Sequence, residues 1–129
     1  MPNGFEGKTK VWEKMDDPLI ELEIKIIEFG NEKKLKYTKN YHNWPTRSLT
    51  WGLFIKRRIS ISAAKDSESK YNFTITAWRD TFKKRYIKYE YIKKDVDIVE
   101  IKIELPALLE RSKKILDTWK KEDLELVKA

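Results

Sequence analysis

Apolar and polar residues alternate through the middle of the chain, as they do in β-strands with one buried face. Over residues 49–62 one parity is apolar apart from Arg57, and the other is mostly polar. Residues 71–78 alternate in the same way, and the stretch 65–69 between the two runs is rich in turn-forming residues. We therefore predict two strands joined by a hairpin loop.

Shorter runs extend this pattern on both sides. Residues 19–29 alternate Leu and Ile with Glu and Lys and predict a strand, which Gly30 and Asn31 end. Residues 35–41 predict the next strand, followed by a loop at 42–45. Residues 85–92 and 96–104 predict a further strand pair hinged at 93–95.

The hydrophobic period then changes from two to that of a helix. Pro106 suits a first helical turn, and an apolar stripe follows it. We predict one C-terminal helix over residues 106–124. The expected fold is therefore α+β, a single domain over 1–129 with an antiparallel sheet of five to six strands. The polar residues 1–15 are expected to be mobile.

The strand parities predict which side chains share a face of this sheet. One face, covered by the C-terminal helix, would hold Leu49, Leu53, Ile55, Ile59, Ile61, Phe73 and Ile75. The opposite face would present Phe54, Lys56, Arg58, Trp78, Lys84, Tyr86 and Lys88. Cations and rings on an open face form a stacking platform for bases. Alternatively, the rings of this face pack under the first strand or against a second subunit.

Composition narrows the class of protein. No run of apolar residues is long enough to span a membrane, and the first residues lack the apolar core of a signal peptide. We therefore expect a soluble cytoplasmic protein without membrane contact. Cysteine and glutamine are absent, and Lys, Glu and Ile are abundant. This bias is typical of hyperthermophiles, and AT-rich coding sequence produces it too.

The charge is divided along the chain. The formal net charge is +7, yet residues 33–94 hold 17 Lys and Arg against 4 acidic residues, so the flanks are acidic. Charge of one sign gathered on one region attracts polyanions. The same stretch is rich in Tyr, Trp and Phe, and unpaired bases stack on such rings while phosphates bind the cations. We therefore predict sequence-independent binding of single-stranded nucleic acid, with DNA favoured.

The candidate site residues follow from charge and parity. The expected phosphate contacts are Lys56, Arg57, Arg58, Arg79, Lys83, Lys84, Arg85 and Lys88. The expected stacking residues are Trp44, Phe54, Trp78 and Tyr86. Arg57 lies on the apolar parity, so a bulge or strand end would be needed to free it.

Enzyme chemistry has little support in the sequence. His42 is the only histidine, which excludes paired-histidine sites, and we expect neither catalysis, nor a metal, nor a cofactor. One alternative is a Mg²⁺-dependent nuclease, in which Asp80 and the Glu100–Lys102 pair would gather on strands. Alternating surface residues explain Glu100 and Lys102 equally well.

A second alternative is a protein-interaction or dimerisation module without a nucleic-acid role. Leu109 and Leu116 are seven residues apart, as are Leu108 and Ile115, a spacing that permits helix pairing between subunits. Packing of the helix on the chain's own sheet explains this spacing as well, and we expect a homodimer, through a helix or a sheet edge, on general grounds.

In outline, the chain resembles the small single-stranded-DNA-binding proteins of rod-shaped archaeal viruses. The shared features are size, richness in Lys and Ile, lack of cysteine, a basic strand-rich middle and a C-terminal helix. The resemblance implies a fold other than the OB-fold, a dimer, and work beside viral replication proteins in the host cytoplasm. The chain is also similar to single-strand-binding proteins of hyperthermophilic archaea that end in a dimerising helix. No residue role is carried over from either group.

Overall fold

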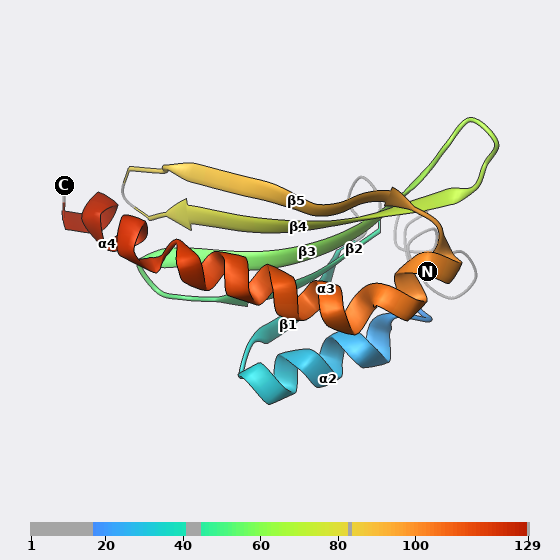
Figure 1. The fold of residues 1–129 in the computed structure, drawn as a ribbon, viewed down its shortest axis with the longest axis horizontal. Coiled ribbons are helices and arrows are strands. Elements are labelled where there is room, and N and C mark those ends of the chain that lie inside the picture. Colours follow the sequence, from blue (N-terminus) through green and yellow to red (C-terminus); the bar gives the residue numbers. More distant parts are fainter. Residues whose placement is uncertain (1–16, 41–44, 83, 129) are drawn as a thin grey trace, which may run out of the picture.

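The computed structural model describes residues 17–40, 45–82 and 84–128. Its centre is one antiparallel sheet in which every strand pairs with its neighbour in sequence, in the order β1-β2-β3-β4-β5. The strands are β1 (Lys36–Asn40), β2 (Thr46–Trp51), β3 (Ile55–Lys65), β4 (Tyr71–Thr81) and β5 (Ile87–Val96), and the helices are α2 (Glu23–Lys33), α3 (Ile98–Thr118) and α4 (Lys120–Lys128). The α+β class and the C-terminal helical segment are confirmed, with five strands (Figure 1).

α2, α3 and α4 lie on one side of the sheet, and no helix of the described residues covers the other side, which we call the open face (Figure 1). The predicted apolar parity faces them: Leu49, Ile55, Ile59, Ile61, Phe73 and Ile75 are buried. Leu53 is the exception, because it belongs to the turn between β2 and β3 and is 77% exposed. In the described residues no helix is long and apolar enough to cross a membrane.

The prediction of a strand over residues 19–29 is wrong, since α2 occupies most of this range. α2 buries Ile26 and Phe29, and the turn before it buries Leu19 and Leu22, so the buried positions follow the spacing of a helix and not that of a strand. Gly30 does not end a strand. It lies within α2, where a Cβ would come within 2.8 Å of Leu49 Cδ2, so the glycine allows the helix to approach β2.

The predicted strand over residues 96–104 is also wrong, because α3 begins at Ile98. The Asp97 carboxylate caps this helix by accepting a hydrogen bond from the Glu100 backbone N–H at 2.8 Å. α3 therefore starts eight residues before Pro106, which sits inside the helix on its exposed side. The single helix expected to reach residue 124 is two helices, which are joined at Trp119.

The long alternating run over residues 49–62 is divided between β2 and β3. Gly52 makes the turn with φ +98°, where a Cβ would clash with the Ile55 carbonyl oxygen at 1.9 Å. Residues before and after the turn keep the same alternation. The sequence pattern therefore predicts the buried residues correctly, although it does not show that the strand is interrupted. The predicted hairpin loop at 65–69 is confirmed in position between β3 and β4.

A buried arginine fastens α2 to the sheet. The Arg47 side chain is fully buried on the helix side of β2, where it donates to Asp17 and, at 3.1 Å, to Glu23. Burial disfavours the charged form, but these hydrogen bonds raise the pKa of Arg47 above its ordinary value. Tyr37 lies beside the group, and burial raises its pKa to about 12, against the effect of Arg47.

Candidate nucleic-acid interface

The open face of the sheet carries rows of side chains that cross from strand to strand. One row joins Lys36, Thr50, Arg58, Trp78 and Tyr89, which lie opposite one another along the register of β1 to β5. A second row joins Thr38, Ser48, Ser60, Thr76 and Tyr91. Directly opposed residues in antiparallel strands point to the same face, so each row forms a continuous surface.

The aromatic part of this face lies over β4 and β5. Trp78 and Tyr89 stack with ring centroids 6.0 Å apart, and Tyr91 meets Tyr89 edge-on at 5.6 Å. Tyr89 and Tyr91 are about half exposed, at 55% and 50%. The rings therefore face solvent, although the burial of Trp78 is intermediate.

Two cations sit directly on these rings. The Arg58 guanidinium lies 4.7 Å from the Trp78 ring centroid, and Lys94 Nζ lies 4.9 Å from that of Tyr91. Burial lowers the pKa of Arg58, while the nearby Asp80 carboxylate opposes this effect. Each pair places a positive charge beside a flat ring. A cation binds the phosphate of a nucleotide, and an aromatic ring stacks on its base.

The open face is hollowed, and the rings and cations described above line this hollow of about 780 Å³ together with a set of hydroxyl side chains. Its floor on β2, β3 and β4 consists of Thr46, Ser48, Thr50, Ser60, Ser62, Thr74 and Thr76. The Ser48 and Ser60 hydroxyls lie 3.2 Å apart and form a hydrogen bond across β2 and β3. Such hydroxyls hydrogen-bond phosphate and sugar oxygens without adding charge.

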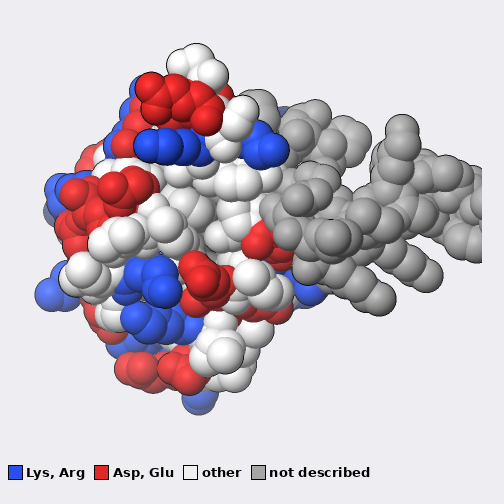
Figure 2. All heavy atoms as spheres, turned by 90° about the vertical axis from the view of Figure 1, so that its right-hand side faces the viewer, with Lys and Arg blue, Asp and Glu red and all other residues white. Residues whose placement is uncertain are grey.

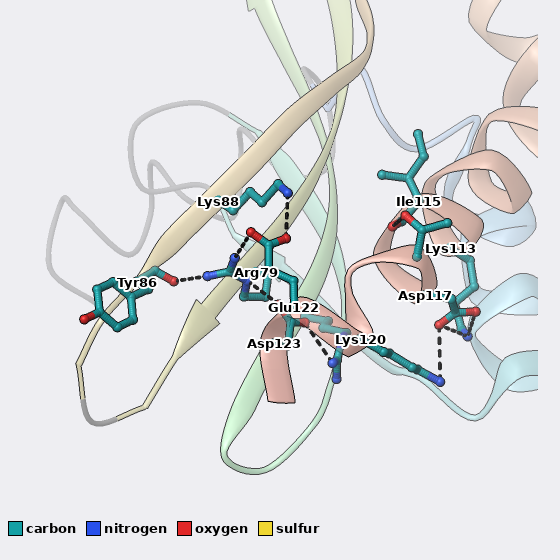
Figure 3. A network of polar contacts seen from close by, with 11 residues as sticks. Arg79, Tyr86, Lys88, Lys113, Ile115, Asp117, Lys120, Glu122 and Asp123 are labelled. Carbon is teal, nitrogen blue, oxygen red and sulfur yellow. Dashed lines mark hydrogen bonds and ion pairs between the residues drawn. The ribbon is translucent and has the colours of Figure 1, made fainter. Parts of the chain in front are cut away.

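Three of the predicted phosphate contacts lie on the other side of the sheet. Arg79 is buried, with Nε 2.8 Å from the Asp123 carboxylate, and Arg57 donates to the same carboxylate at 2.9 Å. Lys88 binds Glu122 at 2.8 Å and lies over the Trp119 ring. Figure 3 shows Arg79 and Lys88 converging on α4.

The prediction that Lys88 lies on the open face is therefore wrong. β5 pairs Lys88 with Arg79 and Tyr89 with Trp78, so the parity of β5 is one residue away from the expected one. Arg57 is not freed by a bulge, because Asp123 reaches it from α4. The hydrogen bond from Lys88 lowers the pKa of Glu122, as a stable ion pair does.

Other predicted residues gather at one end of the sheet. Phe54 lies in the β2–β3 turn and Tyr86 beside the β4–β5 turn, with Lys84 and Arg85 nearby, and Arg85 pairs with Asp80 at 3.2 Å. Phe54, Lys84 and Tyr86 therefore lie in turns and not on the predicted open face, whereas Lys56, Arg58 and Trp78 keep it. Trp44 and Lys83 lie outside the described residues.

Charges are mixed over other parts of the surface. Figure 2, which looks onto the end where α2 and α3 begin, shows basic and acidic side chains side by side and no area of one sign. Ion pairs such as Lys33 with Glu110 and Lys93 with Glu104 also bring opposite charges together. The positive charge of residues 33–94 is thus partly neutralised by acidic residues of α3 and α4.

Sequence reasoning missed several residues of the open face, namely Lys36, Tyr89, Tyr91, Lys94 and the hydroxyl floor. The floor had a visible signal, since Ser or Thr occupies every second position in residues 46–50, 60–62 and 74–76. The tyrosines were missed because their parity depends on the register between β4 and β5, which the β4–β5 turn determines.

The residues of the nuclease alternative are not brought together. Glu100 lies at the start of α3, 3.7 Å from Lys93, whereas Asp80 pairs with Arg85 on the other side of the sheet. Among the described residues no group of three or more His, Asp or Glu is placed to hold a metal ion.

Comparison of the chain with protein-family profiles, with curated proteins and with solved structures finds no match.

Proposed function

We propose that the protein binds single-stranded nucleic acid, DNA in preference, on the open face of its sheet and without reading base sequence. The observation that carries the proposal is the row of Arg58, Trp78 and Tyr89, in which a cation and two stacked rings face a hollow. Unpaired bases expose the flat surfaces that such rings bind, whereas the bases of a duplex do not.

The arrangement suggests how a nucleotide enters. In the free protein Arg58 covers Trp78 and Lys94 covers Tyr91. A phosphate attracts each cation away from its ring, and the base then takes the place of the cation on the ring. The hydroxyl floor donates further hydrogen bonds to the backbone, which are the same for every base.

The salt dependence of binding should be moderate. The cations of the open face in the described residues are Lys36, Lys56, Arg58 and Lys94. At about −0.7 per phosphate contact, these four give a log–log slope of ~−3 for an oligo-dT strand. Eight contacts, as the sequence predicted, would give ~−5.6. The measurement is fluorescence anisotropy of labelled oligo-dT over a range of salt concentrations.

Two single variants test which side of the sheet is used. Arg58→Ala should lower the salt slope by ~0.7, because one phosphate contact is lost. Lys88→Ala, on the helix side, should leave the slope unchanged. If Lys88→Ala lowers the slope and Arg58→Ala does not, the nucleic acid binds elsewhere.

Trp78→Ala should weaken binding of oligo-dT by ~1–3 kcal/mol, because the stacking surface for one base is removed. Duplex affinity should change little. Trp78→Phe, which keeps a ring, should retain most of the single-strand affinity. An equal loss for single strand and duplex would show that the indole acts only in the structure of the sheet.

A further inference from the structure

A second exposed surface lies at the end of the sheet where β3 begins and β4 ends. Two turns, the first residue of β5 and α4 meet there and present large apolar side chains to solvent: Leu53, Phe54, Phe82, Tyr86, Ile87 and Leu124. We call this surface the tip. Half of the exposed large apolar residues in the described chain belong to it. Such clustering marks an interaction site, since isolated exposed apolar residues are scattered.

The tip is held in shape by backbone hydrogen bonds. The Phe82 backbone N–H donates to the Phe54 carbonyl oxygen at 2.9 Å, which joins the β4–β5 turn to the β2–β3 turn. The β4–β5 turn is closed by a bond from the Tyr86 N–H to the Thr81 hydroxyl at 2.8 Å. The two turns that carry the apolar side chains are therefore fixed by hydrogen bonds, and little conformational entropy is lost when a partner binds.

The tip contains a groove between the β2–β3 turn and α4. Its volume is about 330 Å³, and its walls are Leu53, Phe54 and Leu124, over a floor of Ile55. Leu53 and Leu124 are 77% and 57% exposed, whereas Ile55 is buried, so the groove is recessed. This volume lies at the low end of small-ligand sites and fits one or two apolar side chains.

Lysine side chains border the groove. Lys120 lines it, 3.6 Å from Asp117 of α3, and Lys84 is exposed at the same end of the sheet. The nearby acidic groups are engaged, since Asp80 binds Arg85 and Asp123 binds Arg57 and Arg79. A partner that fills the groove and complements its rim therefore carries Asp or Glu next to an apolar side chain.

From this combination we propose that the tip is a docking site for a short acidic segment of another protein, one whose large apolar side chain enters the groove. A recessed groove with a cation on its wall favours a peptide over a lipid surface, which needs only protruding apolar residues. The groove lies against α4, on the helix side of the sheet, so the protein could hold a partner there and a nucleic acid on the open face at the same time.

The test is selection of a phage-displayed library of random short peptides on the full-length protein. Enriched peptides should combine Leu, Phe or Trp with neighbouring Asp or Glu. Leu53→Ser and Lys120→Glu should each weaken an enriched synthetic peptide about tenfold or more, which is ~1.4 kcal/mol. The matched control is Ile103→Ser on α3, because Ile103 is as exposed as Leu53, at 77%. This variant should bind like the wild type.

Three results would overturn the proposal. The first is that the wild type enriches no peptide more strongly than the Leu53→Ser variant does. The second is that the enriched peptides are basic. The third is that the protein binds phosphatidylglycerol vesicles in a way that depends on Leu53 but binds no acidic peptide. Thermal unfolding of each variant shows whether it is folded. The oligo-dT affinity of Leu53→Ser should equal that of the wild type. The peptide measurement therefore tests the tip alone, and the oligo-dT measurement tests the open face alone.

Discussion

Asp123→Ala should destabilise the protein by about 3–5 kcal/mol, because it removes the carboxylate on which two arginines of the sheet converge. Asp123 is fully buried, 2.9 Å from Arg57 and 2.8 Å from Arg79 (Figure 3). The Arg79 side chain is itself buried, and its remaining acceptors are the Tyr86 carbonyl and a longer contact to Glu122. Urea unfolding followed by circular dichroism measures the loss.

Two neighbouring variants separate this effect from helix propensity. Glu125→Ala makes a comparable change on the exposed side of α4 and should change stability by less than about 0.5 kcal/mol. Asp123→Asn keeps the volume but loses the charge, so its effect should lie between the two. If Asp123→Ala and Glu125→Ala have the same effect, the ion pairs of Asp123 with Arg57 and Arg79 contribute nothing measurable to stability.

The ion pairs of Asp123 with Arg57 and Arg79 explain why the charge along the sequence overestimates the number of cations available to bind nucleic acid. Arg57, Arg79 and Lys88 belong to the basic stretch, but Glu122 and Asp123 come from the acidic flank. The division of charge along the chain thus reflects, in part, two segments that pair in the fold. A cation count becomes a binding prediction only when the carboxylates facing each cation are known.

The strands of the middle were predictable because alternation and burial agree there. For residues 19–29 alternation alone was misleading, since Ile20 in the turn and Ile24 on α2 are exposed while Leu19, Leu22 and Ile26 form the buried stripe. The start of α3 had a local signal in Asp97 followed by Glu100, the spacing of an N-terminal cap. The β-branched residues after it favoured a strand instead.

The candidate site was predictable in its chemistry more than in its residues. Arg58 and Trp78 follow from the parity of β3 and β4, which the sequence shows directly. Their partners Tyr89 and Lys94 depend on the register of β5, which also contains an irregularity near Ile75. A shift of one residue moves a whole strand to the other face, as it did for Lys88.

Arg47→Met should also destabilise the protein by about 3–5 kcal/mol, since it leaves the Asp17 carboxylate buried without its cation. Arg47 is the largest fully buried side chain described, and it connects β2 to the chain before α2 and to Glu23, the first residue of that helix. Methionine fills most of the volume, so the expected loss comes from the charge and its hydrogen bonds. Urea unfolding measures it.

A matched comparison comes from the second cation on Glu23. Lys39 Nζ lies 4.0 Å from the Glu23 carboxylate but is partly exposed, so Lys39→Met should cost less than about 1 kcal/mol. The double variant Arg47→Met with Asp17→Asn should recover part of the stability, because no buried carboxylate is then left without a cation. Equal losses for Arg47→Met and Lys39→Met would show that burial does not strengthen the Arg47 contacts, and that α2 is held by its apolar side chains alone.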